Sequence, residues 1–275
     1  MAWQAGTSDA QAAATARLVA VSAPGKAAVG FYAASIVAAE ACVAFVGSLP
    51  GIYVHAALVF VVLNHYLFAP KAAPSADLPR VLLALPLVSL LRILSLTMAV
   101  NDIPEIYRPA VAGAPLLVAA VFVLKLLAPT VPVGLIPGNR RSWFVQALVA
   151  LVGIPLGLLG YAIARPDPLL DSSEWPKLIA AAAVLLIFSG LTEELVFRGL
   201  VQATLRNALG WVAVPLASVL FASVYFGASA GLIVFFAGTG VVFGAFYDRT
   251  RCLLGIIGAH ALLSIGLILI WPLVL

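Results

Sequence analysis

The chain has 275 residues, of which 64% are hydrophobic and only 9% are charged, and its mean hydropathy is +1.14. This composition excludes a soluble globular domain and a disordered chain, and it is typical of a polytopic helical membrane protein. The formal net charge is +4. Because the positive residues are spread over short loops, as membrane topology requires, they do not indicate nucleic-acid binding.

A lead-in of residues 1–26 is followed by a series of apolar stretches, each near the ~20 residues that a helix needs to cross a bilayer. Pro, Gly and charged residues punctuate these stretches. We therefore predict an all-α fold, a polytopic transmembrane helical bundle of about eight or nine spans. The expected spans are residues 27–47, 51–69, 81–100, 109–128, 143–164, 178–206, 211–227, 230–247 and 253–274.

The distribution of Lys and Arg over the loops predicts the orientation. With the N-terminus in the cytoplasm, the inside segments hold nine Lys and Arg residues, and the outside loops hold three. Positive residues gather on the cytoplasmic side of membrane proteins. We therefore expect the N-terminus, with its lead-in 1–26, to lie in the cytoplasm.

A polar break at residues 165–177 divides the chain into two membrane regions. Residues 27–164 form the expected N-terminal region of five helices, and they carry no motif to which a function is assigned. Two deep charges in that region, Glu40 and Arg92, are expected to pair with each other or with backbone groups, while a substrate or ion path is the alternative. All other candidate chemistry lies after the break, in residues 175–275.

The apolar stretch 178–206 contains an unusual group of charges, Glu193, Glu194 and Arg198. Charged groups inside a bilayer are costly, so they are candidates for function by default. Glu194 and Arg198 are four residues apart and lie on one helix face, which predicts an ion pair. Glu193 points about 100° away around the helix, so this pair leaves it free. A purely structural pair that fixes helix register would explain Glu194 and Arg198 but not Glu193.

Polar side chains on later spans can reach the same depth in the membrane. Glu193 and Tyr225 both lie about 20 Å from the turn between their two spans, at 1.5 Å per residue. His260 and Ser264 share a face of the last span. A carboxylate and an imidazole in one pocket can activate water and stabilise an oxyanion, which is the minimum for peptide hydrolysis without a covalent intermediate. The candidate catalytic residues are Glu193, Glu194, Arg198, Tyr225, His260 and Ser264.

The segment Glu193-Glu-Leu-Val-Phe-Arg-Gly199 resembles the Glu-Glu-x-x-x-Arg motif of the CPBP intramembrane proteases, a family that includes type II CAAX prenyl endopeptidases and bacteriocin-processing and immunity proteins. Residues 240–250 and 258–264 are similar to the last two helices of that family. The resemblance covers residues 175–270 and makes 175–275 a CPBP-like protease core. It implies that Glu193 activates water, that Glu194 and Arg198 orient the site, and that His260 and the residue four later polarise the scissile carbonyl.

Two positions depart from the family pattern. Tyr225 stands where the family has a histidine, in Phe221-Ala-Ser-Val-Tyr225, and Ser264 stands where it has Asn or Asp. Tyrosine can donate or accept a hydrogen bond, but its reference pKa of about 10 makes it a poor base at neutral pH. Either Tyr225 orients a site in which Glu193 works, or hydrolysis has been lost and the scaffold kept.

These features predict an intramembrane endopeptidase that cleaves a membrane-associated peptide or protein with a glutamate-activated water. The alternatives are a catalytically inactive CPBP-fold protein that acts as an immunity or assembly partner, and a transporter or channel with a buried Glu/Arg/His relay. We expect no cofactor and no metal, because a zinc site needs more than the single histidine of this cluster. The expected partners are the lipid bilayer and a peptide or protein substrate, without nucleic acid, in a multi-pass protein of a prokaryotic cell membrane. The sequence leaves the oligomeric state open.

Overall fold

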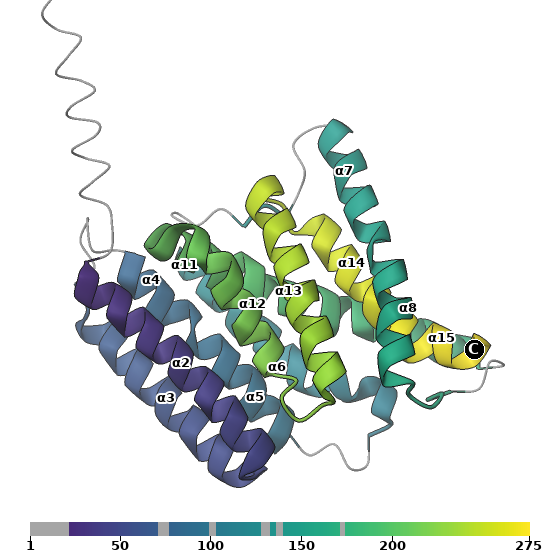
Figure 1. Ribbon diagram of the computed structural model, residues 1–275, viewed down its shortest axis with the longest axis horizontal. Helices are drawn as coiled ribbons and strands as arrows, with labels where there is room; N and C mark the ends of the chain where they lie inside the picture. Colours follow the sequence, from purple (N-terminus) through teal and green to yellow (C-terminus); the bar gives the residue numbers. More distant parts are fainter. Residues whose placement is uncertain (1–21, 71–76, 99–102, 128–132, 136–139, 171–173) are drawn as a thin grey trace, which may run out of the picture.

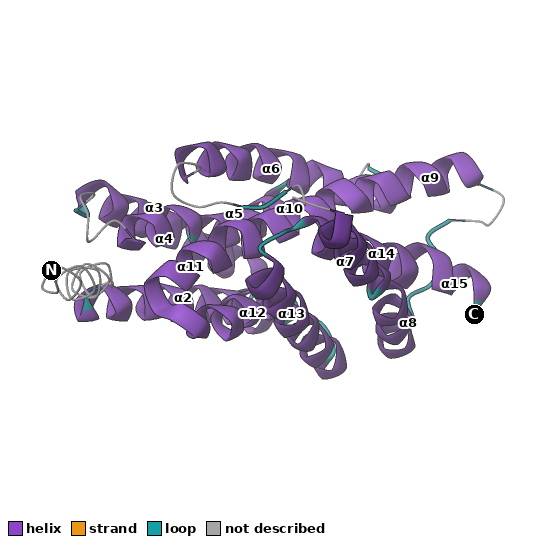
Figure 2. Cartoon of the chain, turned by 90° about the horizontal axis from the view of Figure 1, so that it is seen from above, coloured by secondary structure: helices purple, strands orange, loops and turns teal. Residues whose placement is uncertain are grey.

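The computed structural model describes residues 22–70, 77–98, 103–127, 133–135, 140–170 and 174–275, with only the backbone of Pro24 and Arg140. All regular secondary structure in these residues is helical, which confirms the predicted all-α class (Figure 2). The lead-in 1–26 lies mostly outside the described residues. From Ser22 onward, a side-chain cap opens the first described helix, because the Ser22 hydroxyl accepts a hydrogen bond from the Gly25 backbone N–H (3.3 Å).

The N-terminal region is a set of long helices that run side by side (Figure 1). Helix α2 packs on α3, α3 packs on α4 and α5, and α5 packs on α6. The break between α4 and α5 falls at Pro86, which cannot donate a backbone hydrogen bond. The first elements of this region are α2 (Ala23–Phe45), α3 (Ser48–Phe68), α4 (Asp77–Ala84), α5 (Pro86–Thr97), η1 (Glu105–Tyr107) and α6 (Arg108–Leu127).

The C-terminal region is built around α14, which packs against the segment η2 and also against α7 and α8, the last two helices of the N-terminal region. Helix α13 packs on α12 and lies beside α14 in Figure 1. Three segments, η2, η3 and η5, have π-helical hydrogen bonding. The N-terminal region ends with α7 (Arg140–Leu151) and α8 (Gly153–Ala164). The elements of the C-terminal region are α9 (Trp175–Val184), η2 (Leu185–Leu191), α10 (Thr192–Glu194), η3 (Leu195–Gln202), α11 (Ala203–Leu209), η4 (Gly210–Val212), α12 (Ala213–Ser223), α13 (Ala230–Thr250), α14 (Leu254–Ile265), η5 (Gly266–Ile270) and α15 (Trp271–Val274).

Within the described residues, eight helical segments are long and apolar enough to cross a bilayer, which agrees with the predicted eight or nine spans. The sixth and seventh expected spans form one continuous helical segment, Trp175–Ser223. It folds back on itself at Gly210, whose φ of +66° lies in the left-handed region that glycine adopts readily. Helix α12 therefore packs against α11 and η3 as the second arm of a hairpin.

Loops that were predicted to share a side of the membrane do lie at the same end of the bundle. The Leu253 N–H donates to the Gly134 carbonyl (2.8 Å), and Arg206 pairs with Asp248 (3.1 Å). These contacts join the breaks after the fourth, sixth and eighth expected spans, which lie on the cytoplasmic side if the N-terminus does and the spans alternate. The alternation of the spans is thereby supported, and the assignment of this end to the cytoplasm stays a prediction.

The segment η3, which carries Arg198, is buried along its whole length. All eight residues of η3 are buried, including Arg198, and Val196, Leu200 and Val201 have no exposed surface. Large apolar side chains such as Phe68, Phe144 and Val234 are exposed on the outside of the bundle. An apolar outer surface around a buried polar centre is the arrangement that a bilayer favours. The charged motif thus lies at the packing centre of the C-terminal region.

Candidate active site

Glu193 and Glu194 lie on α10, a short α-helical stretch between the π-helical segments η2 and η3. Irregular turns of this kind leave backbone groups to be satisfied by side chains, and they are frequent at functional sites. Here the Thr192 hydroxyl donates to the Ile187 carbonyl (2.8 Å), five residues earlier. Thr192 thereby stabilises the widened turn that precedes the two carboxylates.

The predicted ion pair of Glu194 and Arg198 is present. Arg198 Nη1 donates to Glu194 Oε1 (2.9 Å), and Arg198 Nη2 donates to the carbonyl of Gly240 on α13 (3.3 Å). The guanidinium carbon lies 4.6 Å from the ring centroid of Phe221 and 5.7 Å from that of Phe243. Both charged side chains are almost completely buried, so the pair depends on these contacts in place of water.

His260 connects the ion pair to Glu193. Its Nδ1 lies 2.6 Å from Glu194 Oε1, and its Nε2 lies 3.8 Å from Glu193 Oε2. An ionised Glu194 can only accept a hydrogen bond, so Nδ1 of His260 carries the proton of that contact. Such a contact fixes both the tautomer and the ring orientation. Nε2 is consequently the ring nitrogen that faces Glu193.

Glu193 differs from Glu194 in its access to open space. The Glu194 side chain is fully buried, whereas the Glu193 side chain is 20% exposed. Glu193 lines a cavity of about 680 Å³. His260 is 2% exposed and is not part of the cavity wall. The Glu193 carboxylate is therefore the group of the cluster that faces the cavity, and His260 is buried next to it.

Ser264 and one unpredicted serine complete the cluster around His260. Ser189 Oγ lies 3.4 Å from His260 Nε2 and 3.1 Å from Ser264 Oγ. The close approach of η2 to α14 depends on Gly190, because an added Cβ would lie 2.9 Å from the Ile257 carbonyl oxygen. The signal that could have identified Ser189 is its position four residues before Glu193, on the same helix face.

Tyr225 lies beside Glu193 on the wall of the same cavity, but its backbone is not where the sequence placed it. Helix α12 ends at Ser223 rather than at residue 227, and Tyr225 stands in the turn that follows. The Tyr225 ring stacks on Phe236, with centroids 3.7 Å apart and an angle of 12° between the planes, and it makes an edge contact with Phe221. The described residues record no hydrogen bond of its hydroxyl group. This stacking fixes the phenol at the cavity wall.

The cavity is enclosed mainly by apolar side chains from α5, α6, α9, η2 and η5. The charged side chains on its wall come from both membrane regions: Arg92, Glu105, Arg108 and Glu193. The predicted pairing of Glu40 with Arg92 is confirmed, because Arg92 Nε donates to Glu40 Oε2 (2.7 Å). The position of Arg92 on the cavity wall was not predicted, because residues 27–164 contain no motif that relates them to Glu193.

The donor set of the cluster comprises the carboxylates of Glu193 and Glu194 and the imidazole of His260. Among the described residues, no group of three or more His, Cys, Asp or Glu side chains has the arrangement needed to hold a metal ion.

A polytopic helical bundle with an apolar outer surface and a buried Glu-Glu/Arg/His cluster defines the class of the protein as an integral, multi-pass membrane protein. Residues 175–266 match the family model described as type II CAAX prenyl endopeptidase Rce1-like. The recognition of this family from the sequence is thus confirmed for that segment, which supports a CAAX-type intramembrane protease kind of function. No curated protein and no solved structure matches the chain. Helices α2 to α8 lie outside the matched segment.

Proposed function

We propose that the protein is an intramembrane endopeptidase that hydrolyses a peptide bond of a membrane-associated peptide or protein with water activated by Glu193. The observation that carries this proposal is the position of Glu193. It is the carboxylate of the cluster that reaches the cavity, and it lies 3.8 Å from an imidazole that the other carboxylate holds in place. A general base needs such access to both the substrate and a partner group.

The proposed reaction needs no covalent intermediate. Glu193 accepts a proton from a bound water as the water oxygen attacks the scissile carbonyl, and negative charge develops on the carbonyl oxygen. Hydrogen-bond donors at the cavity wall, with Tyr225 as the leading candidate, stabilise that oxyanion. The C–N bond then breaks, and the proton held by Glu193 passes to the leaving amine. Glu194 and Arg198 act by holding His260, which supports the charge of Glu193 during this cycle.

The shape and chemistry of the cavity support a substrate that is largely apolar. Its wall is formed by side chains such as Leu94, Met98, Leu185 and Phe188, with few charged groups among them. Pockets of this type bind apolar groups and use a small number of polar side chains to fix orientation. A peptide that carries a lipid group, or that ends in apolar residues, fits this description, and the lipid bilayer is the medium from which it would enter.

The central test is Glu193→Gln, assayed with a purified, lipid-reconstituted protein and a fluorogenic S-prenyl peptide. Removing a general base is expected to lower the cleavage rate by about 10²- to 10⁴-fold. Expression and thermal stability should change little, because the Glu193 carboxylate is partly exposed and lies outside the Glu194–Arg198 pair.

Glu105→Gln is the matched control, because Glu105 lines the same cavity without belonging to the cluster. This variant should keep the wild-type rate. Cleavage that continues at the wild-type rate in Glu193→Gln would show that the assigned mechanism is wrong.

Tyr225 favours a second candidate function, that of a catalytically inactive relative which binds a partner through the same cavity. Its phenol occupies the position at which the family has a histidine. The variant Tyr225→His separates the two candidates. An inactive scaffold should gain activity from the histidine, whereas an enzyme that already uses the tyrosine should be slowed or unaffected.

A further inference from the structure

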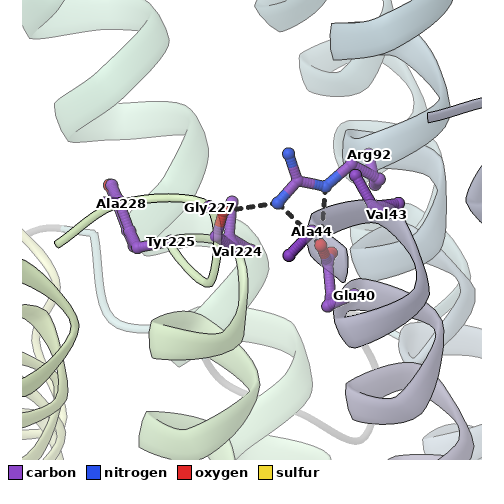
Figure 3. A pocket seen from close by; sticks show the side chains of 8 residues that line it. All are labelled: Glu40, Val43, Ala44, Arg92, Val224, Tyr225, Gly227 and Ala228. Carbon is purple, nitrogen blue, oxygen red and sulfur yellow. Dashed lines mark hydrogen bonds and ion pairs between the residues drawn. The ribbon is translucent and has the colours of Figure 1, made fainter. Parts of the chain in front are cut away.

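A second cavity, of about 390 Å³, adjoins the one that Glu193 lines. Figure 3 shows that its wall comes from α2, α5 and the turn between α12 and α13. Arg92, Val224 and Tyr225 line both cavities, so these three residues mark the place where the two spaces meet. The residues that line the second cavity are Glu40, Val43, Ala44, Arg92, Val224, Tyr225, Gly227 and Ala228.

Two charged side chains make the wall of the second cavity polar. Arg92 Nε donates to Glu40 Oε2 (2.7 Å), and Arg92 Nη2 donates to the Val224 carbonyl. The remaining terminal nitrogen, Nη1, points away from Glu40 and Val224 in Figure 3, and the Arg92 side chain is 14% exposed. Glu40 Oε1 is buried and makes no hydrogen bond among the described residues. Charged groups within a bilayer face one another or a water-filled cavity, and roomy polar cavities hold water.

Gly227 marks the mouth of the second cavity, because it lines the cavity and is exposed. Nothing lies within 4 Å of a Cβ added to it, so the space beside it is open. The mouth lies near the ends of two spans, since Ala44 is close to the end of α2 and Ala228 closely precedes α13. A bilayer gives way to water at the ends of its spans. Water can therefore reach the cavity from this end.

The proposed hydrolysis needs a water supply that a bound substrate does not block. Each cleaved peptide bond consumes one water, whereas the cavity of Glu193 is enclosed mainly by apolar side chains. An apolar substrate that fills this cavity expels water from it. Glu193 is not part of the wall of the second cavity, but Tyr225 lines the larger cavity together with Glu193. The second cavity thus adjoins the catalytic space beside the substrate.

We propose that the second cavity is filled with water and supplies the water that Glu193 activates, by a passage between Arg92 and Tyr225. This inference rests on the proposed peptidase function. The two side chains that border the passage are fixed independently, Arg92 by Glu40 and Tyr225 by stacking on Phe236. The N-terminal membrane region thereby takes part in the reaction, because α2 and α5 form one side of the water-filled cavity.

Thiol labelling tests whether the second cavity holds water, without depending on peptide cleavage. Ala44→Cys and Ala228→Cys each place a thiol on the cavity wall, in liposome-reconstituted protein whose native cysteines, Cys42 and Cys252, are replaced by Ala. A charged methanethiosulfonate reagent, present on both sides of the membrane, reacts with the thiolate, which forms in water but not in apolar surroundings. Both thiols should react at least about tenfold faster than that of Gly238→Cys, on the exposed face of α13. If they react no faster, the cavity is dry and the proposal is wrong.

Gly227→Leu tests the route, because it places an apolar side chain at the mouth where an added Cβ meets no atom. Gly227 is not among the described glycines with positive φ, so its backbone accepts a side chain. The variant should slow the labelling of Ala44→Cys. It should also lower kcat for an S-prenyl peptide by about tenfold and leave KM nearly unchanged, since the substrate binds in the other cavity. Gly227→Ala, with a much smaller side chain, should keep most of the rate.

Gly238→Leu is the matched control, because it adds the same side chain at another glycine with open space around it, outside both cavities. It should keep the wild-type kcat. If Gly227→Leu slows labelling but keeps kcat, water reaches Glu193 through the end of the larger cavity at Glu105, and the proposed supply is wrong. A higher KM at unchanged kcat would show that the second cavity binds substrate, which also contradicts the proposal.

The water supply and the peptidase activity fail in different ways. If wild type cleaves no peptide, the peptidase proposal fails, and the hydration of the second cavity stands or falls on the labelling rates alone. If wild type cleaves the peptide while the thiols at Ala44 and Ala228 do not react, the peptidase proposal stands and the water-filled cavity is refuted.

Discussion

The two membrane regions contain the same three kinds of side chain in two different arrangements. In the C-terminal region, Glu194 is joined to Arg198 and His260. In the N-terminal region, Glu40 is joined to Arg92 and lies 3.7 Å from His55. Both glutamates are buried, and both sets lie within the bundle. The comparison shows how the packing around a buried Glu–Arg–His set decides which charge faces a cavity.

The arginine has opposite roles in the two sets. Arg198 comes from the same helical segment as its glutamate and is covered by two aromatic rings, so the pair is closed and the neighbouring Glu193 faces the cavity. Arg92 pairs across two helices and keeps one edge on the cavity wall. The C-terminal set therefore presents a carboxylate, which suits base catalysis, and the N-terminal set presents a cation, which suits a wall in contact with water.

The largest effect is expected from replacing Arg198, the arginine that two aromatic rings cover. Arg198→Leu leaves Glu194 buried with only His260 as a polar partner, and breaking a buried pair in this way costs roughly 3–5 kcal/mol. We expect a large fall in the thermal unfolding temperature in detergent, with loss of folded protein at growth temperature.

Arg92→Leu should cost less, because the Arg92 side chain is 14% exposed whereas the Arg198 side chain is 1% exposed, so water can replace part of the lost contact. Equal losses of stability in the two variants would contradict the distinction between a closed and an open set.

A second test addresses the contact that brings η2 to α14. Gly190→Val adds a side chain where even a Cβ would lie 2.9 Å from the Ile257 carbonyl oxygen and 3.0 Å from the Ala261 Cβ. Overpacking of this kind lowers the free energy of unfolding by roughly 1–3 kcal/mol. It should also displace Ser189 from His260, so the cleavage rate per folded molecule should fall as well.

Gly238→Val is the matched control, because nothing lies within 4 Å of its added Cβ and the position is exposed. If both glycine variants keep the wild-type rate, the close approach of η2 to α14 does not support the site.

Much of the fold was predictable because its determinants are local. Hydropathy gives the spans, and the i, i+4 spacing gives the Glu194–Arg198 pair. The exact course of the chain around Tyr225 was not predictable, since the apolar pattern continues through residue 227 while the helix ends at Ser223. Periodicity does not indicate where stacking on Phe236 replaces a helical turn.

The site was only partly predictable for a related reason. Sequence motifs singled out Glu193 and His260 as candidate site residues, and both lie in the matched segment. Arg92 reaches the site through tertiary packing alone, because α5 packs against the turn at Val224. Ser189 lies only four residues before Glu193, but its contacts with His260 and Ser264 depend on the packing of η2 on α14. A single sequence carries no signal for contacts between helices that are far apart in the chain, apart from the cost of leaving a deep charge without a partner.

The smallest expected effect concerns Ser189, which we infer to be a positioning residue for His260. Ser189→Ala removes a hydroxyl 3.4 Å from His260 Nε2 and 3.1 Å from Ser264 Oγ, without leaving a charge unpaired. A single neutral hydrogen bond contributes about 0.5–1.5 kcal/mol, so the cleavage rate should fall by roughly two- to tenfold with little change in stability. Ser189→Thr, which keeps the hydroxyl, should restore part of the rate.

Ser95→Ala is the control, because Ser95 lines the same cavity but donates to the Arg92 carbonyl on its own helix. If Ser189→Ala and Ser95→Ala have the same small effect on the cleavage rate, Ser189 does not position His260. The orientation of His260 then depends on its contact with Glu194 alone.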